Sequence, residues 1–400
     1  MNGVRVLDLS RVLAGPWATQ HLADQGAEVI KVEAPSGDET RLFGPVVDGV
    51  STYFLSCNRN KRSIVLDLRS AAGREVVGRL AARADVLVHN FRPGVADRLG
   101  VDWPRLRARN AGLVYVALSG FGSDTKARTR AGYDLVLQAM GGAMSFTGRP
   151  GDPPTRAGTP VADLTAGLLV VQAVLHGLLH RAHTGEGQRI EVNMMQAQAA
   201  ALVYHVSRYT VTGEVETPRG NAHRGLVPYD VYRCADGWLA VACGNDRLWQ
   251  RLVGALGLPE RAEWATNLLR VADRAGVDAA MRGALLPLSV ADAEARLVAV
   301  GVPVGPVLGV AEALDHPAVR TIDLSVPGLG DVRVAGPILR TATTRAAHAT
   351  PPVLGADCDE VLREAGYREE DIDALAVRGA FGVRRHEGAS GGGSSTEAGA

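Results

Sequence analysis

The sequence has few lysines and no excess of either charge. Only three of its 43 basic residues are lysines (Lys31, Lys61 and Lys126), so guanidinium groups must do most of any phosphate binding. Acidic residues also number 43, and a chain without net charge creates no overall field that attracts nucleic acid or anionic lipid. The composition therefore argues against a nucleic-acid-binding protein and against one held on a membrane surface.

Cysteine is also scarce, and long apolar runs are missing. The four cysteines form no C-x-x-C pair and are too sparse for a disulfide framework in a chain of 400 residues. The N-terminus lacks a basic segment followed by an apolar core, and the most apolar stretch, residues 164–179, is interrupted by polar side chains. We expect a protein of the reducing cytoplasm that is neither secreted nor membrane-spanning.

The first two hundred residues alternate short β-branched apolar runs with longer helical patterns. This alternation is typical of βαβ units around a parallel sheet. It predicts strands at residues 4–9, 28–32, 64–68, 86–89, 114–118 and 188–192, and helices at residues 17–25, 71–84, 133–144 and 164–179. The fold class is therefore α/β, with a doubly wound sheet.

The pattern changes after about residue 205. Residues 231–234 and 238–243 read as a hairpin across Ala235-Asp236-Gly237, and Ala-rich helices follow to about residue 300. This part is expected to be a smaller α+β domain. Residues 326–334 return to strand-like runs, residues 359–375 are helical in pattern, and the Gly- and Ser-rich end of the chain is expected to be disordered.

The sequence does not support three common functional sites: a dinucleotide-binding loop, a nucleophile elbow and a metal site. The loop at residues 10–16 has one glycine followed by a proline, whereas a dinucleotide fingerprint needs G-x-G-x-x-G to approach a pyrophosphate. Residues 388–392 match the string G-x-S-x-G, but they lie in a low-complexity tail and not between a strand and a helix. His176, His180 and His183 share one helix face without a carboxylate or thiolate partner, so no metal site is predicted.

Asp163 is the candidate nucleophile. It is a lone carboxylate between a loop and a strongly apolar helical segment. An aspartate in this position can simply cap the helix by accepting N–H groups of the first turn. The helix dipole also favours its charged form, and an ionised carboxylate is what attack on an activated acyl group requires. The two roles are compatible.

A series of short motifs occurs in order from about residue 3 to residue 380. They are residues 6–16 (VLDLSRVLAGP), 26–33 (GAEVIKVE), 58–63 (NRNKRS), 84–94 (ADVLVHNFRPG), 119–122 (SGFG), 132–134 (GYD), 159–167 (TPVADLTAG), 184–188 (TGEGQ) and 301–307 (GVPVGPV). As a set these motifs are specific, and the chain resembles the class III coenzyme A transferases, the CaiB/BaiF type that includes formyl-CoA and carnitine CoA-transferases.

The resemblance implies a transferase in which Asp163 attacks an acyl-CoA thioester and CoA is passed to a second carboxylic acid. The exchange would run through a mixed anhydride and an aspartyl-CoA thioester, which replaces one hard step by several easier ones. Coenzyme A and acyl-CoA would be substrates, with no permanently bound cofactor and no metal. The implied CoA contacts are Leu13, Ala14, Leu66, Arg69, Asn90, Phe91, Arg92, Arg98 and Tyr133.

The resemblance also implies an architecture. Residues 1–205 would form the first part of a Rossmann-like, CoA-binding large domain, residues 206–325 a small α+β domain, and residues 326–383 a return to the large domain. Residues 384–400 would be a disordered tail. Two such chains would thread through each other as an interlocked homodimer.

Two departures and two rivals accompany this interpretation. Ala34 stands where some members carry an arginine for the nucleotide, so either Arg41 takes over that contact or the contact is missing. No Gly-rich covering loop like that of formyl-CoA transferase is found around residues 221–225.

The α-methylacyl-CoA racemases carry a histidine where this chain has Tyr133, and tyrosine, with an ordinary pKa near 10, is a poor base. A nicotinamide oxidoreductase has only the N-terminal βαβ unit in its favour.

Overall fold

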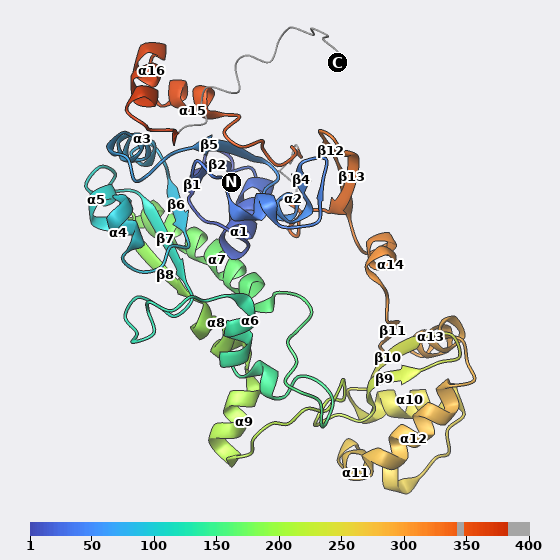
Figure 1. The fold of residues 1–400 in the computed structure, drawn as a ribbon. Coiled ribbons are helices and arrows are strands. Elements are labelled where there is room, and N and C mark those ends of the chain that lie inside the picture. The colour runs from blue at the N-terminus through green and yellow to red at the C-terminus, as the bar shows by residue number, and fades with distance from the viewer. Residues whose placement is uncertain (342–347, 383–400) are drawn as a thin grey trace, which may run out of the picture. The chain divides into compact units, whose positions relative to one another are not determined.

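The computed structural model describes residues 1–341 and 348–382, which form two compact units (Figure 1). Unit 1 comprises Met1–Gly142, Gly158–Val203 and the chain from Arg320 onward, and unit 2 comprises Ala143–Ala157 and Tyr204–Val319. The sequence division left residues 143–157 in the large domain, whereas these residues pack with unit 2. The tail predicted to be disordered, residues 384–400, lies outside the described residues.

Unit 1 is built on a six-stranded sheet in which every neighbouring pair is parallel. Its spatial order is β5 (Lys61–Val65), β2 (Glu28–Glu33), β1 (Arg5–Asp8), β6 (Val86–His89), β7 (Val114–Ser119) and β8 (Arg189–Asn193). This is the strand order of a Rossmann fold, which reverses direction between β1 and β6. The prediction of an α/β fold with a central parallel sheet is confirmed.

Both faces of the sheet are covered, so successive residues of each strand point into different cores. Leu7, Ile30 and Leu87 face a core formed with α3 (Ala71–Ala81), α4 (Val95–Leu99), α5 (Trp103–Arg107), α15 (Cys358–Glu364) and α16 (Glu369–Val377). Val6, Val29 and Val86 face the opposite core, formed with α1 (Ala14–Asp24), α6 (Asp134–Met140) and α7 (Val161–Thr184). Burial on both sides explains the nearly continuous apolar runs in the sequence.

The remaining elements of unit 1 lie around this sheet. They are α2 (Thr52–Cys57), α8 (Met194–Ala201), a short 3₁₀ helix η1 (Glu39–Leu42), and two antiparallel pairs, β3 (Val46–Val47) with β4 (Val50–Ser51) and β12 (Thr321–Val326) with β13 (Gly330–Ala335). The C-terminal segment protects the edge strand β5, since the Ser63 N–H donates to Asp357 Oδ2 at 2.7 Å and the Asp67 N–H donates to the Ala380 carbonyl at 2.7 Å.

Helix α7 is the one described helix that is long and apolar enough, by length and composition, to cross a membrane. Its Ala162, Ala166, Val170 and Val174 are buried in the core that it forms with the sheet and α1. A core helix of a folded domain passes the same test. The length and apolar composition of α7 are therefore explained by its position in the core of unit 1.

Unit 2 has a three-stranded sheet with helices packed on it. The strands are β9 (Tyr229–Arg233), β10 (Trp238–Ala242) and β11 (Val304–Pro306), paired antiparallel in the order β11, β10, β9. The helices of its core are α10 (Asp246–Leu256), α11 (Asn267–Ala272), α12 (Arg274–Leu285) and α13 (Val290–Ala299), with the short 3₁₀ turn η3 (Ala262–Trp264). The unit also contains α9 (Tyr204–Thr212), α14 (Val310–Asp315) and the 3₁₀ turn η2 (Ala143–Ser145), none of which has a buried residue. The predicted hairpin is present as β9 and β10.

Candidate active site

The carboxyl ends of β1 and β6 meet where the strand order of the sheet reverses. In open parallel sheets, ligands bind in the crevice at this point. The loops that follow the two strands are tied together: the Arg11 N–H donates to Asn90 Oδ1 at 2.9 Å, and Asn90 Nδ2 donates to the Arg11 carbonyl at 2.7 Å. Helix α1 then begins after Leu13 with no side chain capping its first turn, so its N–H groups are suited to an anion.

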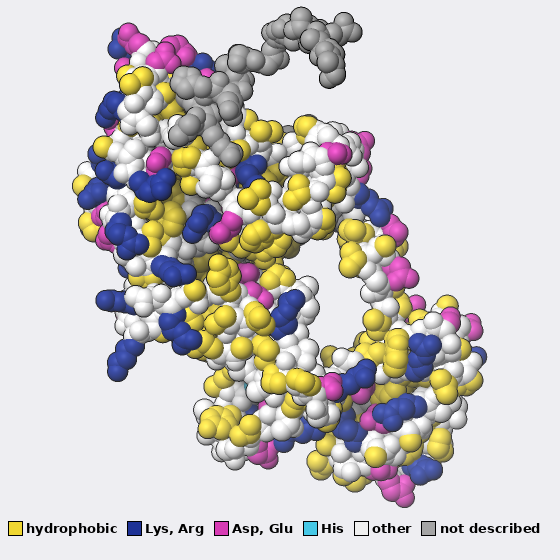
Figure 2. Space-filling model, viewed as in Figure 1, with side chains coloured by type: hydrophobic (Ala, Val, Ile, Leu, Met, Phe, Trp, Pro, Cys, Tyr) yellow, Lys and Arg dark blue, Asp and Glu magenta, His cyan; other side chains and the backbone are white. Residues whose placement is uncertain are grey.

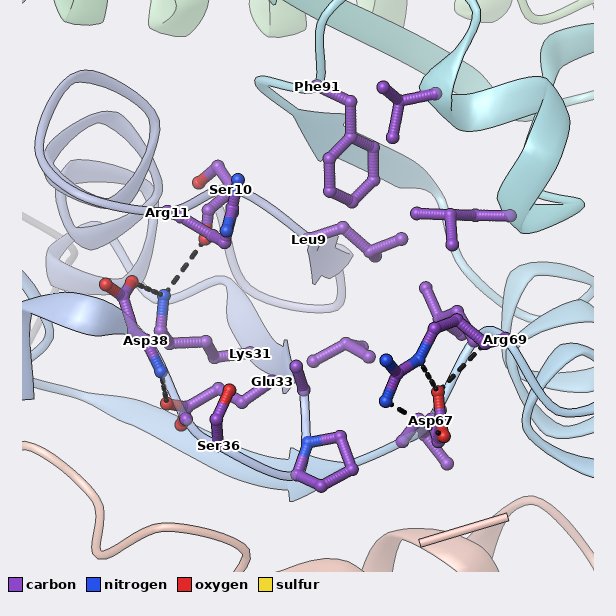
Figure 3. Close-up of a pocket in the computed structure, with 18 residues that line it drawn as sticks. Leu9, Ser10, Arg11, Lys31, Glu33, Ser36, Asp38, Asp67, Arg69 and Phe91 are labelled. Atoms are coloured by element: carbon purple, nitrogen blue, oxygen red, sulfur yellow. Dashed lines mark hydrogen bonds and ion pairs between the residues drawn. The ribbon is translucent and has the colours of Figure 1, made fainter. Parts of the chain in front are cut away.

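A first cavity of about 490 Å³ opens at this crevice (Figure 3). Three of the predicted CoA contacts line it, namely Leu66, Arg69 and Phe91. Arg69 and Phe91 lie on different sides, and the Lys31–Asp38 ion pair of 2.8 Å forms another part of the wall. The Arg69 side chain is 80% exposed and contacts Asp67 at 3.0 Å (Nε to Oδ1). An ion pair this exposed is weak and can exchange for a phosphate.

A second cavity of about 370 Å³ shares Arg11, Phe91 and Val95 with the first. Its lining brings together eight of the ten predicted site residues, which come from the loops after β1 and β6, from α1, α4 and α7, and from the N-cap of α6. They are Leu13, Ala14, Asn90, Phe91, Arg92, Arg98, Tyr133 and Asp163. The other two, Leu66 and Arg69, line the first cavity only. The crevice therefore has two parts that meet at Phe91.

Asp163 lies in the first turn of α7 but is not its N-cap. The helix begins at Val161, and its N-cap, Pro160, has no side chain that can accept a hydrogen bond. The Ala162 N–H donates instead to Asp134 Oδ1 at 2.9 Å. The simple N-cap interpretation of Asp163 is therefore wrong, because a carboxylate from α6 caps α7 and leaves the Asp163 carboxylate on the cavity wall.

The surroundings of Asp163 hold its carboxyl near the point of half-ionisation at neutral pH. Burial, and secondarily the charge of Asp134, raises the pKa of Asp163 to about 7. The Tyr53 hydroxyl is affected in turn, since burial and the Asp163 charge raise the pKa of Tyr53 to about 12. A carboxylate with a raised pKa on a cavity wall is typical of a residue that does chemistry.

Arg41 does not replace a basic residue at position 34. Its guanidinium donates to both carboxylate oxygens of Glu33, at 2.8 and 2.7 Å, and to the Pro352 carbonyl at 3.1 Å. It also lies 3.8 Å from the centroid of the Phe54 ring. Arg41 lines neither cavity, whereas Ala34 lines the first. Arg41 is thus bound to β2 and its surroundings and not to the crevice.

Some lining residues were not predicted from the sequence. Arg11, Arg128 and Arg130 line the second cavity, and Asp134 caps the helix that carries Asp163. Arg128 and Arg130 lie just before the motif Gly132-Tyr133-Asp134 but outside it, so the motif did not identify them. No local pattern indicates that Asp134 binds an N–H group 28 residues further along the chain.

No metal centre is found in the described part of the chain. Within residues 1–341 and 348–382, no three His, Cys, Asp or Glu side chains are grouped so that they could hold a metal ion. His176, His180 and His183 lie along α7 without such a group. The G-x-S-x-G string at residues 388–392 lies outside the described residues.

A Rossmann-like sheet whose two-part crevice is lined by arginines, with an aspartate of raised pKa on its wall, is typical of an enzyme that acts on a phosphate-bearing substrate. The model of CoA-transferase family III matches residues 1–358, and the chain belongs to this family. The resemblance found in the sequence is confirmed. The protein is therefore a CoA-transferase, and its substrates include CoA thioesters.

Similar proteins agree with this assignment. A succinate–glutarate CoA-transferase of Agrobacterium fabrum is 37% identical over 385 residues, which cover 91% of this chain and 95% of that protein. An acetyl-CoA:oxalate CoA-transferase of Acetobacter aceti is 37% identical over 84% of this chain and 88% of its own length. The crystal structure of a CAIB/BAIF family protein from Brucella suis is 37% identical, with a TM-score of 0.81 over 91% of this chain and 98% of that one.

Asp134, which caps α7, should influence the pH dependence of activity through the pKa of Asp163. In Asp134→Asn the amide oxygen can still accept the Ala162 N–H, but the negative charge beside Asp163 is gone. The pKa of Asp163 should fall, and the acid limb of kcat/KM, which reports the free enzyme, should move to lower pH. Asp124→Asn, which removes an equal charge from the β7–α6 connection, is the matched control. An acid limb at the same pH in both variants would contradict the coupling.

Proposed function

We propose that the protein moves CoA from an acyl-CoA thioester to a free carboxylic acid through covalent intermediates on Asp163. The observation that carries this proposal is the Asp163 carboxylate, held on the wall of the cavity that contains Asn90, Phe91 and Arg92. At pH 7 about half of this carboxyl would be ionised and able to attack. Its raised pKa also makes it a better nucleophile, when ionised, than an ordinary aspartate.

The proposed exchange consists of four acyl-transfer steps, which together restore the free Asp163 carboxylate. Asp163 attacks the thioester carbonyl, which releases the CoA thiolate and leaves a mixed anhydride. The thiolate attacks the aspartyl carbonyl, which gives aspartyl-CoA and frees the donor acid. The acceptor carboxylate then attacks aspartyl-CoA to form a second anhydride and release the thiolate again. Attack of that thiolate on the acceptor acyl carbon forms the new thioester and restores the Asp163 carboxylate.

The two cavities suit the two ends of CoA. The first cavity, with Leu66 and Arg69, would take the nucleotide, and Phe91 would lie where the pantetheine arm passes toward Asp163. Arg92 and Arg98, with the uncapped start of α1 at Leu13 and Ala14, would bind phosphate oxygens. The thiol end would then lie in the second cavity beside Tyr133.

The acids exchanged are proposed to be short dicarboxylates. The relatives are named for succinate and glutarate, for oxalate with acetyl-CoA as its donor, and for mesaconate and D-citramalate, so each of these names includes at least one dicarboxylate. Racemisation is not favoured, since these relatives are transferases and the position of the racemase histidine is occupied by Tyr133.

The assembly and compartment of the protein are also part of the proposal. An interlocked homodimer would be the working form, and sedimentation at micromolar concentration should give a dimer, whereas a monomer would contradict it. The four free cysteines support a reducing, cytoplasmic compartment, which cell fractionation would test.

Trapping of the intermediate tests the mechanism. Succinyl-CoA without an acceptor should leave an acyl or CoA adduct on the peptide around Asp163, and hydroxylamine should convert it to a hydroxamate. Addition of glutarate should discharge the adduct and yield glutaryl-CoA by mass. A two-base racemase never acylates its carboxylate. Rapid α-deuteration of a 2-methylacyl-CoA in deuterated water, with no adduct on Asp163, would therefore overturn the proposal.

A further inference from the structure

The second cavity carries more positive charge than its own carboxylates neutralise. Five arginines line it, against two carboxyl residues, Glu39 and Asp163; they are Arg11, Arg92, Arg98, Arg128 and Arg130. Arg11 faces Glu39 at 3.9 Å. The other four form no ion pair with any residue that the structure describes. These four exposed guanidinium groups are therefore free to pair with an anionic ligand.

Arg128 and Arg130 differ from the others in where they come from. Arg92 and Arg98 follow β6, on the part of the crevice assigned above to CoA phosphates, whereas Arg128 and Arg130 lie on the connection from β7 to α6. This connection leads directly into Tyr133 and the cap residue Asp134. Figure 2 shows Lys and Arg side chains projecting from the part of unit 1 where this connection lies.

The connection is a closed loop whose ends touch at two glycines. A Cβ on Gly120 would lie 2.8 Å from Gly132 Cα, and a Cβ on Gly132 would lie 2.6 Å from Gly120 Cα, so no other residue fits at either end. Such compact loops with adjoining ends are often functional. Both glycines line the second cavity, which places the loop at the cavity that contains Asp163.

Further contacts hold the loop in a defined shape. The Ser123 hydroxyl and N–H both donate to Glu191 on β8, and the Gly122 N–H donates to Ser119 Oγ at 3.1 Å. The Arg130 guanidinium lies 5.3 Å from the centroid of the Phe121 ring, a cation–π contact that uses no carboxylate. The loop can therefore present two guanidinium groups without extensive rearrangement.

We infer that Arg128 and Arg130 bind the second, non-reacting carboxylate of the acid that exchanges CoA at Asp163, and so select dicarboxylates over monocarboxylates. This inference rests on the function proposed above. A guanidinium matches a carboxylate with two parallel hydrogen bonds, and in a solvent-exposed site we expect the two arginines together to give roughly a 10- to 100-fold preference. A monocarboxylate of the same length leaves both groups in water and gains nothing from them.

The test compares glutarate with pentanoate, which has the same chain length and one carboxylate fewer. In a ping-pong exchange, kcat/KM for the acceptor reports only the steps after the donor acid has left, so succinyl-CoA can serve as donor throughout. Arg128→Gln, Arg130→Gln and the double variant should each lower kcat/KM for glutarate, the double by about 10- to 100-fold, with little change for pentanoate. Lys126→Gln is the matched control, because Lys126 carries the same charge on the same loop but does not line the cavity.

Loading of Asp163 with CoA in the absence of acceptor shows whether each variant is folded and active in its first half-reaction. Loaded variants with an unchanged ratio of glutarate to pentanoate would overturn the inference while leaving the proposed function intact. Slower loading with an unchanged ratio of glutarate to pentanoate would assign the two arginines to CoA and also overturn the inference. A parent protein that transfers CoA to no carboxylic acid would contradict the proposed function, and the inference with it.

Discussion

Asp163→Ala and Asp163→Asn should each slow CoA transfer by at least about 10³-fold, since the proposed covalent route cannot run without its nucleophile. No neighbouring group can stand in for Asp163. Among the residues that line the second cavity, Glu39 is the only other carboxyl, and it faces Arg11 at 3.9 Å. Asp134 is engaged by the Ala162 N–H and by Gln138 Nε2, at 2.9 and 2.7 Å.

The same substitutions should leave the fold intact. Asp163 caps no N–H group, and the pKa of its carboxyl is raised from 3.8 to about 7 in the folded protein, chiefly by burial. The folded state therefore binds this proton more tightly than the unfolded chain, so stability falls as pH rises from about 4 through 7. Asp163→Asn removes this dependence, and its free energy of unfolding at pH 8 should equal or exceed that of the parent protein.

Two measurements separate catalysis from folding in these variants. Urea unfolding at pH 5 and pH 8 gives the stability, and mass analysis after incubation with succinyl-CoA shows whether the Asp163 peptide gains an adduct. A folded Asp163→Asn protein that still transfers CoA at the parental rate would remove Asp163 from the mechanism. A variant that unfolds more easily than the parent at pH 8 would contradict the electrostatic argument.

The sheet was predictable where burial alone decides the structure. The apolar runs that became β1, β2, β6 and β7 are buried on both faces, so a simple hydrophobic pattern located them. The strand predicted at residues 64–68 is wrong by three residues, because β5 begins at Lys61. A lysine is a poor strand signal, and no local pattern shows that its ammonium group is satisfied by Asp8, which lies 53 residues away.

The start of α7, the helix that carries Asp163, also could not be predicted from the local sequence pattern. The apolar pattern predicted a start at residue 164, yet α7 begins at Val161. The extra turn is stabilised by Asp134, which supplies from α6 the acceptor that Pro160 lacks. Motif resemblance identified the residues that gather in the crevice, because a motif carries tertiary information that periodicity does not. It could not supply the cap between helices, nor the two loop arginines, which stand outside the motifs.

Two of the three lysines of this arginine-rich chain are buried beneath the crevice. The Lys61 side chain is 0% exposed, and its Nζ donates to Asp8 Oδ2 at 3.0 Å, to the Pro16 carbonyl at 2.8 Å and to Asn58 Oδ1 at 2.9 Å. The Lys31 ammonium is equally buried and donates to Asp38 and to the Ser10 carbonyl. A compact ammonium fits between these oxygen acceptors, whereas a planar guanidinium needs more room.

Lys61→Met should therefore lower the free energy of unfolding by about 3–5 kcal/mol, because it leaves the Asp8 carboxylate buried with its nearest cation removed. Burial by itself raises the pKa of Asp8, but the ammonium groups of Lys61 and Lys31 and two hydroxyl donors lower this pKa to about 2. This contribution to stability is present above pH 3.8 and is lost as pH falls toward 2. Loss of Lys61 should therefore make acid unfolding begin at a higher pH.

Three further variants identify the cause by urea unfolding at pH 7. Lys61→Arg keeps the charge but overfills the site, and should cost about 1–3 kcal/mol. Lys126→Met removes an exposed lysine and should change stability by less than about 0.5 kcal/mol. The double variant Asp8→Asn with Lys61→Met should be more stable than Lys61→Met alone, because the unpaired buried charge is gone. If Lys61→Met unfolded at the same urea concentration as Lys126→Met, the buried Lys61–Asp8 pair would make no contribution to stability.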